Sequence, residues 1–190
     1  MKSLENKIIN EGTVLSSEVL KVGNFLNQML DTEFIFKMGK EIAELYKNDS
    51  VTKILTIEAS GIAIAIAAAS FMNVPVVFAK KSRTSTQTGN MYTAEIRSFT
   101  HGNTYTAIVP TDFLSKDDRI LIIDDFLAHG AALNGLLSIL QQSGAHLCGC
   151  AIAIEKGFQG GGDSLRAKGI RIDSLANIDS MSAENGIVFR

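Results

Sequence analysis

The amino-acid sequence predicts an α/β protein with a central, mostly parallel sheet flanked by helices. Short runs that are apolar at every position alternate with segments of helical periodicity along much of the 190-residue chain. Strands that are apolar on both faces are typical of a parallel sheet covered by helices on both sides. In addition, one such run leads into two adjacent carboxylates, Asp124 and Asp125, and open α/β sheets bind ligands at this end of a strand.

The first half of the chain shows a helix–strand–helix–strand pattern. A helix is expected behind Asp31, whose carboxylate suits the N-cap position, and Phe34, Met38 and Ile42 recur in it at helical spacing. The apolar runs KILTIEA and VPVVFAK are predicted as strands, with an alanine-rich helix between them. The expected elements are a helix at 31–48, a strand at 53–59, a helix at 62–72 and a strand at 74–80.

The composition changes after the second of these strands. The segment KKSRTSTQTGNMYT is polar and poor in core residues. In the following AEIRSFTHGNTYTAIV, polar and apolar residues alternate around HGN, as they do in an antiparallel hairpin. A long polar loop inside a compact domain is usually functional or disordered. We therefore expect a flexible loop and hairpin at 81–103.

The alternation of strands and helices resumes in the second half of the chain. Apolar runs again alternate with helical segments, so the parallel sheet is expected to continue. The length suits one domain with its own core, and we expect a single domain over 1–190. The expected elements are strands at 119–124, 146–155 and 170–175 and helices at 131–143 and 162–168.

Charge and hydropathy argue against two classes of partner. The 18 Lys and Arg against 20 Asp and Glu give a net charge of −2 without a long basic run, so we expect no nucleic-acid surface. The longest apolar stretch, residues 61–72, is too short to span a bilayer, and the polar N-terminus has no apolar signal core. We expect a soluble, cytoplasmic protein without membrane contact.

The residue types that most often bind metals show no ligand spacing. Cys148 and Cys150 lie in one predicted strand, where positions i and i+2 share a face, and no second pair accompanies them. The histidines His101, His129 and His146 are far apart in the sequence. Although a C-x-C pair can also hold a metal or form a redox disulfide, we interpret both cysteines as small buried thiols. We expect no metal held by the protein alone.

The stretch RILIIDDFLAHGAAL raises the question of what neutralises Asp124 and Asp125. Adjacent carboxylates repel each other, and a desolvated carboxylate is costly without a partner. The following loop leads into a predicted helix, so its backbone N–H groups can bind an anion beside the helix dipole, and Gly130 allows a close approach. Acids and loop together predict a sugar-phosphate site. Alternatively, the two acids only cap the helix, and both interpretations are open at this point.

This motif resembles the phosphoribosyl-diphosphate signature of the type I phosphoribosyltransferases. Four apolar residues, two acids, two apolar residues and then small-x-Gly-small-small follow in the order of that family. The resemblance implies that Asp124 and Asp125 are catalytic and bind the ribose hydroxyls. It also implies that the phosphate is bound by the next loop, which consists of Ala128, His129, Gly130, Ala131 and Ala132. The family usually has Thr-Gly-x-Thr there, so in this chain more depends on the backbone amides.

Two further segments match the family in place and composition. After the first core strand the family holds the diphosphate on a short loop, and here that loop is Glu58, Ala59, Ser60 and Gly61. After the second core strand it has a mobile loop that closes over the reaction. The resemblance implies that Lys80, Lys81 and Arg83 clamp the diphosphate there, with Lys81 as a catalytic residue. Taken alone, the first segment also fits an ordinary strand-to-helix turn and the three charges also fit a solvated edge.

Base specificity in this family comes from an N-terminal hood, of which residues 1–30 form part here, and from a late loop. The segments EGTVLSSEVLKVGNFLNQMLD and IAIEKGFQGG most resemble those of members that use xanthine. The resemblance implies that Leu20, Asn27 and Lys156 contact the base, since an amide and an ammonium suit the exocyclic oxygens of xanthine. Phe126 either packs on the flat base or belongs to the core.

The resemblance implies a reaction of purine salvage. The 5-phosphoribosyl group of 5-phosphoribosyl 1-diphosphate is expected to pass to xanthine, giving xanthosine 5'-monophosphate (XMP) and diphosphate. Mg²⁺ is expected to arrive with the diphosphate substrate, and the family implies a homodimer. Two alternatives stay open: specificity for adenine, guanine, hypoxanthine or orotate, and a non-catalytic regulator that senses 5-phosphoribosyl 1-diphosphate.

Overall fold

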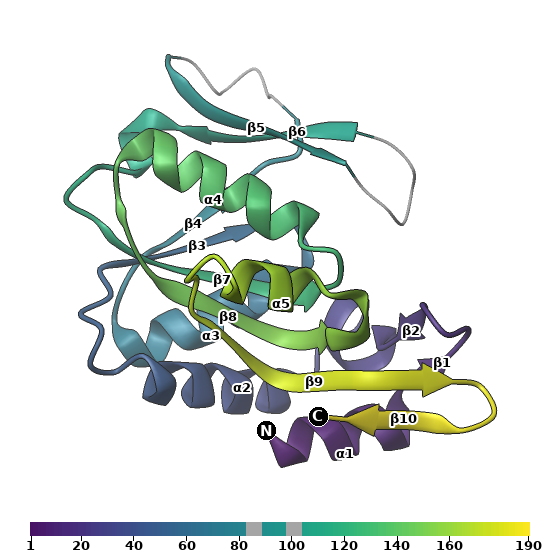
Figure 1. Ribbon diagram of the computed structural model, residues 1–190. Helices are drawn as coiled ribbons and strands as arrows, with labels where there is room; N and C mark the ends of the chain where they lie inside the picture. The colour runs from purple at the N-terminus through teal and green to yellow at the C-terminus, as the bar shows by residue number, and fades with distance from the viewer. Residues whose placement is uncertain (83–88, 98–103) are drawn as a thin grey trace.

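The computed structural model describes residues 1–82, 89–97 and 104–190 (Figure 1). The predicted clamp residue Arg83 and the predicted hairpin turn HGN lie outside these ranges, as does much of the loop expected at 81–103. Within the described ranges, no helix is long and apolar enough to cross a membrane.

Within the described residues, the centre of the molecule is a six-stranded sheet in the order β10–β9–β8–β7–β3–β4. The strands from β9 to β4 are parallel to their neighbours, while β10 is antiparallel to β9. The predicted α/β fold with a mostly parallel sheet is therefore confirmed. The strands are β3 (Lys53–Ile57), β4 (Val76–Ala79), β7 (Arg119–Leu127), β8 (His146–Lys156), β9 (Ile172–Ser182) and β10 (Gly186–Phe189).

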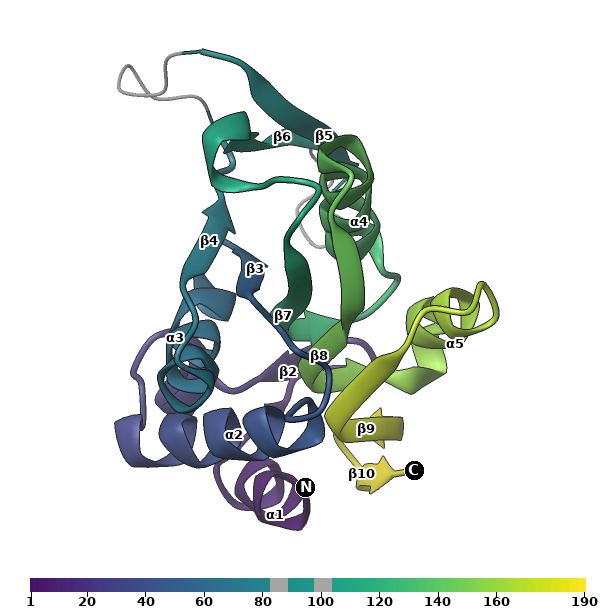
Figure 2. The same cartoon turned by 90° about the vertical axis from the view of Figure 1, so that its left-hand side faces the viewer.

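Helices cover both faces of this sheet (Figure 2). Helices α1 to α3 lie on one side, and α4 and α5 lie on the other. The predicted cap of α2 is confirmed, because the Asp31 carboxylate accepts a hydrogen bond from the Phe34 backbone N–H at 3.1 Å. The helices are α1 (Lys2–Glu11), α2 (Thr32–Leu45), α3 (Ser60–Met72), α4 (Ala131–Ser143) and α5 (Gly161–Arg166).

The core consists of two hydrophobic clusters, one on each face of the sheet. The run that precedes the acid pair is fully buried because it contributes to both. Leu121 and Ile123 pack in the cluster formed with α1 to α3, whereas Ile120 and Ile122 pack in the cluster formed with α4. This arrangement explains why the strand is apolar at every position.

The predicted antiparallel hairpin is also present. Strands β5 (Met91–Arg97) and β6 (Thr104–Pro110) pair along their whole length. Ala94 and Ile96 of β5 pack against α4, and an antiparallel bridge between Lys80 and Ile108 attaches the hairpin to the end of β4. The hairpin therefore lies beside α4, apart from the central sheet (Figure 1).

The N-terminal region contains elements that the sequence pattern did not predict. These are α1, the short antiparallel pair β1 (Thr13–Val14) and β2 (Leu20–Lys21), and the π-helical turn η1 (Gly23–Asn27). Helix α1 buries Leu4 and Ile8, and the Met1 ammonium donates to the Leu175 carbonyl of β9. The two ends of the chain therefore lie close together in both views.

Candidate active site

The connections after four parallel strands meet at one edge of the sheet. Because β8, β7, β3 and β4 are successive neighbours in the sheet and parallel, their carboxyl ends lie side by side. In Figure 1 the arrowheads of β3, β8 and β9 point toward the side of the molecule that carries β1 and β2. The predicted diphosphate loop follows β3, Lys81 of the predicted clamp follows β4, the acid pair lies near the end of β7, and the late loop begins at the end of β8. The fold brings these segments to the same edge.

The acid pair lies within β7, which continues to Leu127 rather than ending at 124 as predicted. Asp124 is only 5% exposed, and its Oδ1 accepts a hydrogen bond from the Asp125 backbone N–H at 3.0 Å. Burial and the adjacent Asp125 charge raise the pKa of Asp124 well above its usual value, and the Lys81 ammonium partly offsets this. Helix α4 begins after Gly130 without a side-chain cap, so the capping interpretation of the acids is wrong.

Gly61 allows the first turn of α3 to approach the acid pair. A Cβ atom at this position would collide with Thr56 Oγ1 and would lie 3.2 Å from Asp124 Oδ1. Any larger residue would therefore push α3 away from β7. The first N–H groups of a helix have no partner within it, so the start of α3 offers donors for an anion beside Asp124.

Glu58 connects the predicted diphosphate loop to the predicted clamp. Its Oε1 accepts a hydrogen bond from the Lys81 backbone N–H at 2.6 Å, and its peptide bond to Ala59 is cis. Ser60 then begins α3. The exposed Lys81 side chain places its ammonium 5.2 Å from the centroid of the Tyr105 ring, on β6. The structure thus brings Lys81 to the edge that carries the acid pair.

The predicted phosphate loop packs against the start of α5. Gly130 has a φ of 83°, and the Gly161 N–H donates to the Ala128 carbonyl at 3.2 Å. A Cβ atom on Gly161 would collide with the backbone of Ala128 and His129, so the two segments pack backbone against backbone. Helix α4 then begins at Ala131, without a side-chain cap, and its first N–H groups have no partner within the helix. This is the geometry of an anion site that uses the backbone.

Two of the side chains predicted to bind the base, Lys156 and Phe126, are in contact. The ammonium of Lys156 lies 5.5 Å from the centroid of the Phe126 ring and donates to the Glu18 carbonyl at 2.6 Å. Burial lowers the pKa of Lys156, while the charge of Glu18 acts in the opposite direction. The partly buried Phe126 ring packs against the core and also contacts this cation, so neither of its two predicted roles excludes the other.

The hood reaches the acid pair through Asn27. Its Nδ2 donates to Asp125 Oδ2 at 2.6 Å, and its Oδ1 is buried without a hydrogen-bond partner in the part of the chain that the structure describes. Leu20, in contrast, is 8% exposed and packs in the core cluster. The structure therefore joins Asn27 directly to the acids, whereas the Leu20 side chain supports the hood from inside.

The donor set offers little for a metal ion by itself. Among the described residues, no group of three or more His, Cys, Asp or Glu side chains is placed to hold a metal. The two cysteines are free thiols; Cys150 is buried, as expected, whereas Cys148 is partly exposed. A Mg²⁺ ion demands octahedral oxygen ligation, so an ion beside Asp124 and Asp125 would need substrate oxygens and water.

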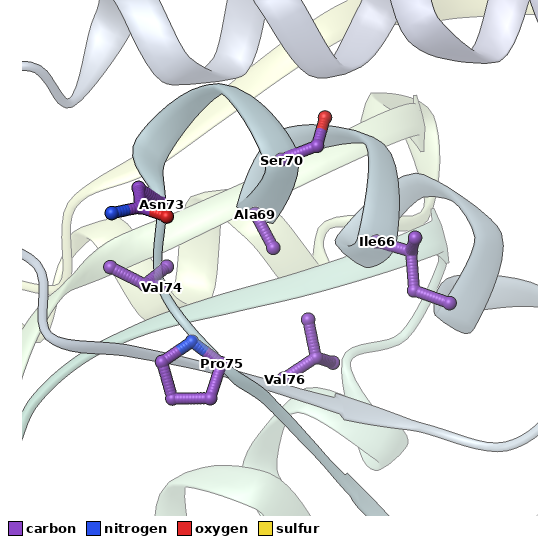
Figure 3. Close-up of a pocket in the computed structure, with 7 residues that line it drawn as sticks. All are labelled: Ile66, Ala69, Ser70, Asn73, Val74, Pro75 and Val76. Carbon is purple, nitrogen blue, oxygen red and sulfur yellow. The ribbon is translucent and has the colours of Figure 1, made fainter.

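A hollow of about 550 Å³ lies away from this edge (Figure 3). It is formed by the end of α3 and the start of β4, and it is lined by Ile66, Ala69, Ser70, Asn73, Val74, Pro75 and Val76. Since β4 begins here, the hollow lies at the opposite end of the strands from the acid pair. It has no titratable side chain and is not the candidate active site.

Sequence reasoning missed several residues that shape the site. Tyr105 contacts the Lys81 ammonium, and Thr56 places a buried hydroxyl beneath Gly61. Glu155 is a fully buried carboxylate at the end of β8. A charge inside an otherwise apolar run was a usable signal for Glu155, and three consecutive glycines were a signal for the close packing at Gly161.

These features define a class of protein. Two acids lie between two helix N-termini that can bind anions, at the carboxyl edge of a parallel sheet. The chain belongs to the phosphoribosyl transferase domain family, whose model matches residues 26–174.

Individual relatives agree with this assignment. The chain is 51% identical to a xanthine phosphoribosyltransferase of Lachnoclostridium phytofermentans, over 100% of this chain and 98% of that protein. It is also 51% identical to a xanthine phosphoribosyltransferase of Heliobacterium modesticaldum, over 95% and 96% of the two chains. Both similarities extend beyond the matched domain into the N-terminal hood.

Solved structures with the same fold include adenine phosphoribosyltransferases. The enzyme from Rhodothermus marinus has a TM-score of 0.74 at 17% identity and covers 93% of this chain and 99% of its own. The enzyme from Trypanosoma brucei, in complex with AMP, pyrophosphate and ribose-5-phosphate, has a TM-score of 0.75 at 19% identity, with coverages of 92% and 79%. At this identity the likeness concerns the fold alone.

Proposed function

We propose that this chain is a purine-salvage enzyme that transfers the 5-phosphoribosyl group of 5-phosphoribosyl 1-diphosphate to xanthine. The products are XMP and diphosphate. The observation that carries the proposal is the acid pair Asp124–Asp125 held between the N-termini of α3 and α4 and joined to Asn27 of the hood. The 51% identity with xanthine phosphoribosyltransferases, over the whole chain, supports xanthine as the base.

The two acids bind the ribose of the substrate. Hydroxyl groups donate to carboxylates, and they approach the Asp124–Asp125 pair without adding a charge. The 5-phosphate lies on the backbone N–H groups of residues 128–132, and the diphosphate lies at the start of α3. Lys81 neutralises the diphosphate from the other side. Each anionic part of the substrate therefore meets donors, and each neutral part meets the acids.

The base lies between the hood and the late loop. The Phe126 ring offers a flat apolar surface, and the ammonium of Lys156 lies beside it to bind an exocyclic oxygen. Asn27 is held by Asp125, so its amide has a fixed orientation toward the ribose end of the base. Leu20 keeps the hood in place from the core side.

Positioning and electrostatics are the main sources of catalysis in this scheme. The bond from ribose C1 to the diphosphate oxygen breaks, a bond from C1 to a ring nitrogen of xanthine forms, and the proton of that nitrogen passes to solvent water. The chain holds the two reactants at a fixed distance and stabilises the charge that develops on the departing diphosphate. Mg²⁺ bound to the diphosphate oxygens would neutralise part of that charge, with Asp124 and Asp125 nearby and water completing its coordination.

A cytoplasmic homodimer stays a prediction. Exposed apolar side chains on α2, α3 and β4 support a second copy as the partner, because large exposed apolar patches mark interaction sites. Phe36 and Phe71 form an exposed edge-to-face pair with centroids 6.2 Å apart. Ile66 and Phe78 are also exposed on this side of the molecule. An Ile66→Glu variant that sediments as a monomer, where the parent is a dimer, would support this face.

The substrate is tested by measuring diphosphate release with a panel of bases. Xanthine should give the highest kcat/KM, and adenine should be at least about 100-fold poorer, because polar groups built for one base are left unpaired by another. Lys156→Gln should lower kcat/KM for xanthine and reduce the ratio of kcat/KM for xanthine to that for adenine. A higher kcat/KM for guanine, hypoxanthine or adenine would refute the specificity. Binding of 5-phosphoribosyl 1-diphosphate without turnover of any base would favour a regulator.

A further inference from the structure

Glu155 is a buried carboxylate that the proposed reaction does not use. It lies at the end of β8 with 0% exposure. Both of its oxygens accept hydrogen bonds from the Arg166 guanidinium, each at 2.7 Å, and Oε2 also accepts from the Ser174 hydroxyl on β9. Burial alone would raise the pKa of Glu155, but the hydrogen bonds from Arg166 and Ser174 outweigh it, so its pKa is lowered. The carboxylate is ionised and fully paired.

The first turn of α5 packs on the ion pair that Glu155 forms with Arg166, at the other end of the same helix. A Cβ atom on Gly162 would collide with Glu155 Oε1 and would lie 2.9 Å from Arg166 Nη1. The first turn of α5 therefore packs its backbone directly on the pair. At the other end of α5, Arg166 Nη2 also donates to the Ile172 carbonyl at 3.2 Å, which ties the helix to β9. Glu155 and Arg166 together fix the distance of α5 from the sheet and the orientation of its axis.

The same helix holds the phosphate loop. Gly161, next to Gly162, donates its N–H to the Ala128 carbonyl and packs against the backbone of His129. Leu165 is 1% exposed, and its Cδ1 would lie 3.4 Å from a Cβ atom on Gly130. Because Gly161 has no side chain, the backbone of α5 contacts the phosphate loop directly. A displacement of α5 would therefore displace the loop as well.

On the opposite face of β8, the next residue is the lysine predicted to bind the base. Successive residues of a strand point to opposite faces, so Glu155 faces α5 while Lys156 faces Phe126 and the hood. The backbone that carries the Lys156 ammonium is thus anchored by the Glu155 side chain. Both groups that must be held at a fixed separation, the phosphate loop and the base lysine, depend on one ion pair.

We propose that Glu155 and Arg166 are positioning residues that set the distance between the phosphate loop and the base-binding lysine. The inference rests on the proposed function for the identity of the two substrates. Neither side chain touches a substrate in this scheme. They act through α5 on one side and through Lys156 on the other. Loss of the pair should therefore weaken the binding of both substrates together, although these bind at different loops.

The test compares two variants of the pair with a matched control. Glu155→Gln keeps the size of the side chain and removes its charge, while Arg166→Lys keeps the charge and removes the two-pronged contact. Asp118→Asn is the control, because Asp118 is paired with Lys53 at 2.9 Å at the amino end of β3 and β7. Glu155→Gln and Asp118→Asn each remove one carboxylate from an ion pair, and Asp118→Asn does so far from the site. KM values for xanthine and 5-phosphoribosyl 1-diphosphate are measured where circular dichroism shows each variant folded.

Both KM values should rise roughly tenfold in Glu155→Gln, less than the ~100-fold that a 1 Å displacement of reacting groups can cost. Arg166→Lys should raise both by a smaller factor, with kcat changed less than KM. Asp118→Asn should leave both near the parent values. Unchanged KM values in folded Arg166→Lys and Glu155→Gln would overturn the proposal, as would an equal rise in Asp118→Asn. If Glu155→Gln does not fold, Arg166→Lys decides by the same criterion.

The parent chain separates this inference from the proposed function. If the parent does not turn over xanthine, the proposed function fails. The positioning role is then measured from the Kd for 5-phosphoribosyl 1-diphosphate alone, which should still rise in both pair variants and not in Asp118→Asn. An unchanged Kd in both pair variants would refute the positioning role in that case too.

Discussion

Two buried carboxylates on neighbouring strands have pKa values that are shifted in opposite directions. Asp124 on β7 and Glu155 on β8 both lie near the carboxyl ends of paired parallel strands. Glu155 is paired with a guanidinium, and its pKa is lowered. Asp124 has Asp125 as its neighbour, and burial together with that like charge raises its pKa well above the usual value.

This difference separates a supporting group from a functional one. A buried charge with a well-placed partner and further hydrogen bonds offsets its desolvation cost, and removal of either partner is strongly destabilising. A buried charge that faces a like charge is held at a cost in folding free energy, and such groups are concentrated at functional sites. The difference supports the proposed binding of the ribose by Asp124 and Asp125 and the proposed positioning role of Glu155.

The largest expected effect is the loss of turnover in Asp125→Asn. The amide can still accept the hydrogen bond from Asn27, so the fold should be kept. It cannot offer a charged acceptor to the ribose, and removing one such interaction typically costs about 100- to 1,000-fold in kcat. Steady-state kinetics measure this, with Asp117→Asn, an exposed acid in a surface turn, as the control. Activity within a few-fold of the parent would contradict the assignment of this acid to the ligand.

The next effect concerns stability, and it is expected from Glu155. Because its pKa is lowered on folding, its contribution is fully present above the ordinary glutamate pKa of 4.5 and is lost as the pH falls through the lower folded-state pKa. Glu155→Gln should cost about 3 kcal/mol at pH 7, the lower end of the usual range for a broken buried pair, because Arg166 is one-third exposed. Urea unfolding from pH 7 to 3 measures it. The difference in the free energy of unfolding between the parent and Glu155→Gln should become smaller below pH 4.5. A difference that does not change with pH would contradict a stabilisation that depends on the ionised Glu155.

Asp124 should behave in the opposite way. An acid whose pKa is raised on folding weakens the folded state once the pH exceeds its ordinary value of 3.8, and the penalty is complete above its folded-state pKa. Asp124→Asn should therefore raise the free energy of unfolding by about 1 kcal/mol at pH 7.5, as substitutions at destabilised active-site positions often do. The difference in the free energy of unfolding between Asp124→Asn and the parent should vanish near pH 4. If Asp124→Asn is less stable than the parent at pH 7.5, the ionised Asp124 does not weaken the folded state and the contrast with Glu155 is wrong.

Much of the fold could be predicted because its signals are local. The helix expected at 131–143 matches α4 at both ends, since Gly130 and Gly144, both with positive φ, bound it. The strand expected at 170–175 was wrong in extent, because β9 continues to Ser182 and pairs with β10. Polar residues at this edge of the sheet hide the strand pattern. Helix α1 buries only Leu4 and Ile8, and its packing against β9 has no local signal.

The site was less accessible to sequence reasoning, because its key contacts join distant residues. The sequence pattern predicted that the acids and two anion-binding loops lie near the carboxyl ends of strands, although the acids lie within β7 and not after it. It had no means to pair Asn27 with Asp125, which are 98 positions apart, or Glu155 with Arg166. Those contacts depend on the path of the hood over the sheet and on the direction of α5. Motifs predict which loops carry the chemistry, whereas the contacts between loops require the fold.

The smallest expected effect tests the cation beside the base. The Lys156 ammonium lies over the Phe126 ring, and such a contact contributes about 0.5–1 kcal/mol at partly exposed sites. Phe126→Leu keeps the apolar contact with the core and removes the ring, so KM for xanthine should rise about two- to fivefold while KM for 5-phosphoribosyl 1-diphosphate stays unchanged. Phe113→Leu, on a phenylalanine that is 54% exposed in the short 3₁₀ helix Thr111–Phe113, is the control. A selective rise would separate base binding from the framework around Glu155, which acts on both substrates. Equal changes in both KM values would place Phe126 with the framework instead.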